Sequence, residues 1–198
     1  MPLAQRKSGE KFTYADYVTW PDDERWELID GEAYNMTPAP TTRHQVVVGS
    51  LYFLLRSLLA GKPCRGFVAP IDVVLSEHDV VQPDVFVVCD EKKITEANIQ
   101  GAPDVVIEVL SPTTALKDRR EKKRLYEKYG VKEYILVDPA GCYVERFLLA
   151  DAGTYNSAEI FGPKEVLSVP SLEGIEIRLW EVFEVEGPNE TVLSLIHI

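Results

Sequence analysis

Two acidic residues stand in apolar segments whose composition is typical of buried strands. Asp84 precedes a Val/Phe run at 85–88, and Glu108 lies inside a Val/Ile run at 105–110. Such short runs, bounded by proline, indicate strands that are buried on both faces of a sheet. A carboxylate there is costly unless a cation or hydrogen-bond donors meet it. Alone, Asp84 is more simply interpreted as a turn cap, and Glu108 as the partner of a nearby Lys or Arg.

Together, the two carboxylates favour a metal site. If their strands are neighbours, Asp84 and Glu108 converge at one place, and the main-chain carbonyl of Val109 stands beside them. Mg²⁺ prefers a few carboxylates, a carbonyl and several waters in an octahedron. We therefore expect Asp84, Glu108 and Val109 to bind Mg²⁺, with Mn²⁺ as the alternative ion.

Three further residues are less decisive. Glu27 interrupts an apolar segment at 26–29, as Glu108 interrupts its own, but an exposed hairpin residue fits the same alternation equally well. Glu32 is an alternative to Glu27, although its place after the turn favours exposure. His44 lies at the start of a predicted helix, and a lone histidine is more often structural than catalytic.

The segment 117–129 predicts an amphipathic helix with a dense basic cluster. At about 100° per residue, Lys122 falls on the face of Leu125 and Tyr126, which points toward the sheet. An inward lysine needs a carboxylate partner. Lys117 and the other basic residues are expected to face solvent. Four of them form either a solvated surface or a patch that contacts DNA phosphates, namely Arg119, Arg120, Lys123 and Arg124.

Composition limits the classes of protein. The chain has 198 residues, 45% hydrophobic and 27% charged, which suits one globular domain. A net charge of −11 disfavours whole-surface binding to nucleic acid, so any contact with DNA must be local. No apolar run is long enough to span a membrane, and the N-terminus lacks the apolar core of a secretory signal. Three scattered cysteines predict reduced thiols in the cytoplasm and argue against zinc.

The remaining segments predict the elements that position these residues. We expect helices near 13–20, 42–59, 115–129 and 179–184, a hairpin turning at Asp30-Gly31, a strand over 65–75, and strands at 133–137 and 142–149. Interleaved strands and helices indicate a mixed α/β domain. We assign residues 1–11 to a frayed N-terminal segment, 12–185 to a single domain and 186–198 to a tail. The last six residues fit nothing before them, and a transposon adapter used in library preparation can encode them, so we interpret them as non-native.

Several motifs follow one another along the chain: Glu27-Leu-Ile-Asp-Gly-Glu, His44, Gln82-Pro-Asp84, Pro103-Asp-Val-Val-Ile-Glu108-Val-Leu-Ser-Pro, and Asp118-x3-Lys122-x3-Tyr126-x3-Gly130-Val-x-Glu-Tyr. With them, the chain resembles the Uma family of restriction endonucleases, a branch of the PD-(D/E)XK nuclease superfamily, over roughly residues 12–185. The resemblance implies an αβββαβ core with a central mixed sheet flanked by helices, a Mg²⁺-dependent phosphodiesterase site and a homodimer.

Within that resemblance, Asp84 matches the Asp of the PD half and Glu108 the acidic residue of the (D/E)XK half. Leu110 stands where the family pattern has Lys, and Lys122 is the candidate to supply the missing ammonium. The sequence thus predicts a metal-dependent DNA endonuclease in which Lys122 orients water or neutralises charge and Glu27 helps to hold a second metal or the water. The alternative is an inactive nucleic-acid-binding or dimerising module on the same fold, which Leu110 and the acidic net charge favour.

Overall fold

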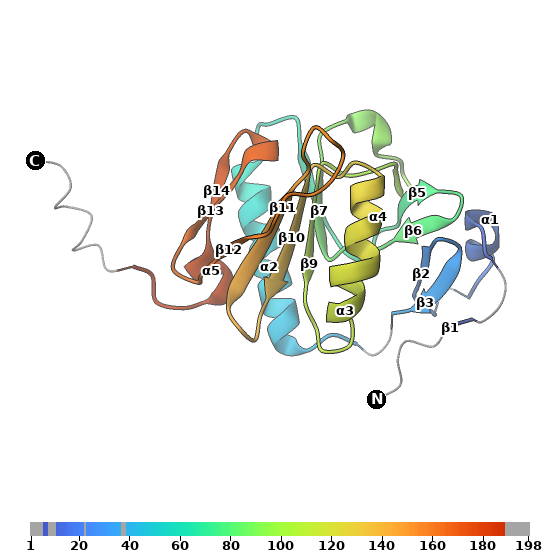
Figure 1. The fold of residues 1–198 in the computed structure, drawn as a ribbon, viewed down its shortest axis with the longest axis horizontal. Helices are drawn as coiled ribbons and strands as arrows, with labels where there is room; N and C mark the ends of the chain where they lie inside the picture. The colour runs from blue at the N-terminus through green and yellow to red at the C-terminus, as the bar shows by residue number, and fades with distance from the viewer. Residues whose placement is uncertain (1–5, 8–10, 22, 37–38, 189–198) are drawn as a thin grey trace, which may run out of the picture.

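Two six-stranded sheets and a two-stranded sheet make up the fold of this computed structural model (Figure 1). The structure describes residues 6–7, 11–21, 23–36 and 39–188. Most of the expected N-terminal segment, and the end of the tail with the six residues interpreted as non-native, lie outside the described residues.

The central sheet has the strand order β12-β11-β10-β9-β7-β4. β9 and β10 run parallel and the other neighbours antiparallel, so the predicted mixed sheet is confirmed. β7 lies beside β9 with Val85 opposite Ile107, so the predicted adjacency of these two strands is also confirmed. The strands are β4 (Arg65–Val68), β7 (Val85–Val88), β9 (Val105–Val109), β10 (Glu133–Asp138), β11 (Tyr143–Leu148) and β12 (Glu159–Phe161).

Helices cover both faces of the central sheet (Figure 1). On one face, Ile107 and Val109 of β9 share a core with α2 (Thr42–Leu58), α5 (Leu179–Phe183) and the β13–β14 hairpin. On the other face, Val106 and Leu110 share a core with Tyr126 of the helix over 115–128. Because side chains alternate along a strand, Glu108 points to this second face. The hairpin strands are β13 (Val166–Val169) and β14 (Ile175–Arg178), and short 3₁₀ turns occupy Glu91–Lys93 and Pro170–Leu172.

The second six-stranded sheet stands beside this core, at the right of Figure 1. Its β2–β3 hairpin turns at Asp30 and Gly31, both with positive φ, which confirms the predicted turn. The preceding helix, α1 (Tyr14–Tyr17), is capped by Thr13 as expected. In sheet order the strands are β1 (Arg6–Lys7), β3 (Glu32–Asn35), β2 (Trp26–Ile29), β6 (Asp79–Val81), β5 (Val73–Ser76) and β8 (Ile99–Gln100).

The prediction of one continuous strand over 65–75 is wrong. The segment forms two strands, and they belong to different sheets: β4 is an edge of the central sheet, whereas β5 lies within the second sheet. Pro70 lies between them, after a cis peptide bond. Because proline has no N–H for a strand ladder, the ladder stops there and the chain crosses to the other sheet.

The helix over 115–128 contains a π-helical turn. It consists of α3 (Ala115–Lys117), the π turn (Asp118–Lys122) and α4 (Lys123–Lys128). In the π turn the N–H of Lys123 reaches the carbonyl of Asp118, five residues back. Gly130, with φ 77°, follows the end of the helix, as predicted.

The cysteine prediction is wrong for two of the three residues. Cys64 and Cys89 form a disulfide, and Cys142 is free. Arg65 of β4 is the register partner of Val88 of β7, so the two flanking cysteines come face to face across the strand pair. This pairing removes the support that reduced thiols gave to a cytoplasmic location. Across the described ranges, no helix is long and apolar enough to cross a membrane.

Candidate active site

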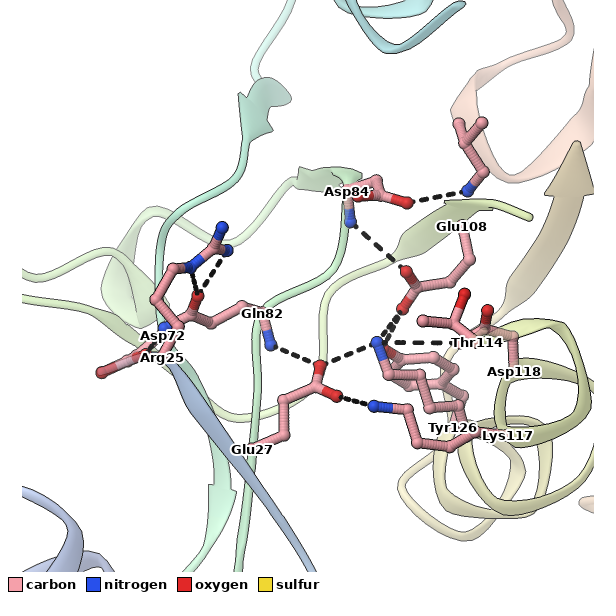
Figure 2. A network of polar contacts seen from close by, with 12 residues as sticks. Arg25, Glu27, Asp72, Gln82, Asp84, Glu108, Thr114, Lys117, Asp118 and Tyr126 are labelled. Carbon is pink, nitrogen blue, oxygen red and sulfur yellow. Dashed lines mark hydrogen bonds and ion pairs between the residues drawn. The ribbon is translucent and has the colours of Figure 1, made fainter. Parts of the chain in front are cut away.

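Asp84 and Glu108 meet at one edge of the central sheet (Figure 2). The N–H of Val109 donates to Asp84 Oδ2 at 2.9 Å, and the N–H of Asp84 lies 3.4 Å from Glu108 Oε2. Glu108 is 3% exposed, whereas the Asp84 side chain is 23% exposed. The two predicted carboxylates are therefore neighbours, and Asp84 is the one that opens to solvent.

Lys122 reaches Glu108 from the helix that covers this face of the sheet. Its Nζ lies 2.9 Å from Glu108 Oε1, 2.7 Å from Glu27 Oε1 and 3.9 Å from Asp118 Oδ1. Burial by itself would lower the pKa of Lys122, but these three carboxylates raise it well above its usual value. Lys122 is thus a protonated, buried ammonium, and Tyr126 adds a hydrogen bond from its hydroxyl to Glu108 Oε1 at 2.7 Å.

Leu110 explains why the ammonium comes from the helix. Leu110 is 6% exposed and packs in the apolar core on the same sheet face as Glu108. A side chain at this position lies two residues along the strand from Glu108 and therefore on its side of the sheet. Strand β9 carries no lysine on this face. Lys122 of the π turn, in the helix that covers the face, supplies the ammonium instead.

Glu27 is fully buried, which excludes its interpretation as an exposed hairpin residue. Its Oε2 accepts from Lys117 Nζ at 2.6 Å, and its Oε1 lies 2.7 Å from Lys122 Nζ. The main-chain N–H of Gln82 also donates to Oε1, at 3.1 Å. Burial would raise the pKa of Glu27, but the two lysines lower it to about 2. Both oxygens of Glu27 are thus engaged with the protein's own cations and donors.

The structure turns Lys117 inward, contrary to the prediction that it faces solvent. In a regular α-helix, residues five apart differ by about 140° in direction, so Lys117 and Lys122 would point to different sides. The π turn closes its hydrogen bond over five residues, which brings such residues nearly into line. The sequence analysis missed Lys117 because it assumed a uniform α-helical period.

The site gathers more acidic groups than lysines. Four carboxyl groups lie there, from Glu27, Asp84, Glu108 and Asp118, with the ammoniums of Lys117 and Lys122. Burial, with the charges of the other three acids, raises the pKa of Glu108 to about 8 against the lowering effect of Lys122, and burial also raises the pKa of Asp118. Added positive charge beside Asp84 and Glu108 would favour the ionised form of Glu108.

The donor set fits a hard divalent cation. Asp84 supplies a carboxylate that solvent reaches, and Glu108 supplies its Oε2, because its Oε1 is held by Lys122 and Tyr126. Mg²⁺ commonly uses one or two carboxylates and keeps several waters. Within the described part of the chain, no group of three or more His, Cys, Asp or Glu side chains forms a ready-made metal cage. The site therefore suits an ion that remains largely hydrated.

His44 stands against the same edge. Its Nε2 lies 3.3 Å from Asp84 Oδ2, and the residue is 7% exposed. Burial would lower the pKa of His44, but the hydrogen bond to Asp84 and the charge of that carboxylate raise it. The helix α2 delivers His44 from its first turn, where Thr41 is the N-cap. Sequence reasoning treated this histidine as structural, and only the fold places it on Asp84.

The four predicted DNA-contacting residues line one surface hollow with Glu127, on the far side of the helix from Glu108. They are not equivalent. Arg119 is bound to Glu145 at 2.6 and 2.7 Å, and Lys123 lies 4.0 Å above the ring of Phe147. Arg120 and Arg124 are exposed.

Comparisons with known proteins agree with this fold. The family model "Uma2: Putative restriction endonuclease" matches residues 14–180. The "Uncharacterized protein slr1290" of Synechocystis sp. is 28% identical over 149 residues, which cover 73% of this chain and 78% of that protein. A crystal structure from Anabaena variabilis, described as "a putative nuclease belonging to DUF820", aligns with a TM-score of 0.72 at 19% identity. The alignment covers 87% of this chain and 98% of the Anabaena chain, which supports the restriction-endonuclease-like fold.

Proposed function

The chain belongs to the Uma2 family of restriction-endonuclease-like proteins, and from this membership and the site geometry we propose that it is a metal-dependent endonuclease that hydrolyses phosphodiester bonds in DNA. The observation that carries the proposal is the approach of Lys122 Nζ to Glu108 Oε1, at 2.9 Å, beside Asp84. Asp84, which solvent reaches, Glu108 and the buried ammonium of Lys122 are groups that metal-dependent phosphodiester hydrolysis can use.

In this proposal Asp84, Glu108 and the carbonyl of Val109 hold Mg²⁺ or Mn²⁺. When bound, the ion polarises the scissile phosphate and lowers the pKa of a coordinated water. Lys122 is protonated, so it stabilises the charge that develops on the phosphate oxygens and does not act as a general base. Its low exposure keeps it in a water-poor setting, where such a charge acts strongly.

Glu27 acts as a positioning residue. Its two oxygens are occupied by Lys117, Lys122 and the Gln82 N–H, so it is placed to fix the ammonium and not to bind a second metal. This differs from the role expected from sequence, in which Glu27 holds a metal or water. The change follows from the burial of Glu27 between two cations.

Two partners complete the proposal. Arg120 and Arg124, the exposed members of the basic hollow, are the candidates for contact with the DNA backbone. Cutting both strands of a duplex calls for two sites, and a symmetric homodimer is the commonest way to provide them.

A plasmid-nicking assay tests the proposed activity. Supercoiled plasmid should be converted to nicked and linear forms in Mg²⁺ or Mn²⁺ and not in EDTA, and Asp84→Asn should abolish the conversion. Cleavage that persists in Asp84→Asn would assign the activity to a contaminant. Absence of cleavage by the wild-type chain, with DNA binding retained, would instead favour the inactive binding module.

A further inference from the structure

A cavity of about 360 Å³ lies near Asp84 along the chain. Gln82, which lines it, is two residues before Asp84, at most about 7 Å of chain. Pro70, which also lines it, follows Ala69, whose N–H donates to the carbonyl of Asp84 at 3.0 Å. Two residues of the lining are thus close to Asp84 or to its main-chain partner.

The walls combine apolar surface with a fixed carboxylate. Phe67, Ile71 and Ile94 supply apolar side chains, and the ring of Phe67 stacks on Phe86 with centroids 5.3 Å apart and planes at 18°. A flat group that enters the cavity against Phe67 would extend this stack by one member. Aromatic stacking of this kind tolerates any nucleobase, because every base has a π-face.

Asp72 is the carboxylate that the cavity presents. The Tyr17 hydroxyl and Gln82 Nε2 both donate to its Oδ1, each at 2.8 Å. Arg25 in turn donates to Gln82 Oε1 at 2.8 Å (Figure 2). Among the contacts of the described residues, both side-chain donors reach the same oxygen, which leaves Oδ2 for a ligand. The hydrogen bonds thus fix the orientation of the Asp72 carboxylate and leave its Oδ2 able to accept further hydrogen bonds.

The charges around the cavity select the chemistry of its occupant. Two carboxylates line it, from Asp72 and Glu96, and none of the described residues that line it is Lys, Arg or His. A phosphate would be repelled. A planar, uncharged group that stacks on Phe67 and donates hydrogen bonds to a carboxylate would be accepted.

We propose that this cavity is a nucleobase pocket that receives a base next to the scissile phosphate and favours bases with amino donors, namely adenine, cytosine and guanine, over thymine. The proposal rests on the proposed nuclease function. Phe67 provides the stacking surface and Asp72 the hydrogen-bond acceptor for the amino group. The volume falls within the range of small-molecule sites.

Binding in the absence of metal tests the pocket independently of cleavage. Fluorescein-labelled hexamers of deoxyadenosine, deoxycytidine and thymidine are titrated with the full chain in EDTA at low ionic strength, and anisotropy is measured. The adenine and cytosine hexamers should bind at least about fivefold more tightly than the thymine hexamer. Phe67→Leu should weaken all three by about fivefold or more. Asp72→Asn, whose amide both donates and accepts, should reduce the preference to less than about twofold.

Asp151→Asn, at an exposed position, is the matched control and should bind like the wild type. Equal affinity for the three hexamers, absence of binding, an unchanged preference in Asp72→Asn or an unchanged affinity in Phe67→Leu would each overturn the pocket. Plasmid cleavage is scored separately. Base preference without cleavage in any metal would overturn the nuclease proposal, and cleavage without base preference would overturn the pocket alone.

Discussion

Lys117 and Lys122 bind opposite oxygens of one buried carboxylate, Glu27, at 2.6 and 2.7 Å. They are five residues apart, a spacing that a regular α-helix would direct to different sides and that the π turn brings into line. The consequence is a lysine, Lys122, whose position is fixed both by Glu27 of the hairpin strand β2 and by Glu108 of strand β9. Several measurable properties depend on this arrangement.

Lys122→Ala should reduce plasmid cleavage by a factor on the order of 10² or more, because it removes the ammonium beside the reacting phosphate. Metal affinity should change much less, since Asp84 and Glu108 remain. Lys123→Ala is the neighbouring control, and its cleavage should stay close to that of the wild type, because its ammonium lies over the ring of Phe147 and not at Glu108. Normal cleavage by Lys122→Ala together with no cleavage by Lys123→Ala would show that Lys123, and not Lys122, provides the ammonium of the active site.

Glu108→Ala should abolish the heat of Mn²⁺ binding in isothermal titration calorimetry, because one of two carboxylate ligands is lost. Glu91→Ala, an exposed acid on the surface, should bind Mn²⁺ as the wild type does. Undiminished binding in Glu108→Ala would place the metal elsewhere in the protein.

Lys117→Met and Glu27→Gln should be strongly coupled in their effect on stability. Each single change leaves a partly compensated charge in a buried site and should cost about 2 kcal/mol or more in the free energy of unfolding, measured by urea denaturation. The double variant should cost at least about 1 kcal/mol less than the sum of the two. Additive effects would show that the two residues do not act as a pair.

Asp79→Asn should destabilise the protein at neutral pH by roughly 1.5–3 kcal/mol. Asp79 is buried and accepts from the Asp30 N–H at 2.7 Å, the Ser76 hydroxyl at 3.0 Å and the Tyr129 hydroxyl at 2.5 Å. Burial would raise the pKa of Asp79, but these donors and Lys128 lower it.

A lowered folded-state pKa gives a defined pH dependence. The contribution of Asp79 is complete above the unfolded pKa, about 3.9, and is lost as pH falls through the lower folded value. The difference between wild type and Asp79→Asn in urea unfolding should therefore be constant from pH 7 to about 5 and shrink below about 4. A difference that grows toward acid pH would contradict the assignment, and Asp151→Asn provides the exposed control.

Homodimerisation predicts that sedimentation velocity detects a species of twice the 22.3 kDa chain mass at micromolar concentration. The fraction of this species should rise with protein concentration. A single monomeric boundary at every concentration would remove the dimer from the proposal.

The sequence predicted the pair of strands and the inward Lys122 because both follow from local periodicity. It left Glu27 undecided, because β2 is buried along its whole length and alternation carries no information there. It misplaced Lys117, since a π turn changes the helical phase without an evident signal in the residue types. The Cys64–Cys89 pair depends on the register of β4 against β7, which is a property of the folded sheet and not of the cysteine spacing.

Lys122 lies on a helix, whereas the proposed metal ligands lie on or beside the central sheet. Mild denaturation should therefore affect catalysis and metal binding separately. The proposed metal ligands lie in strand β9 and directly before strand β7, whereas Lys122 keeps its position only while residues 115–128 remain docked on the central sheet. If that helix detaches first, as a local opening below the global transition, the protein would still hold its ion but would lose its ammonium. Catalysis would then disappear at a lower urea concentration than metal binding, and the gap between the two midpoints would report the docking stability of one helix.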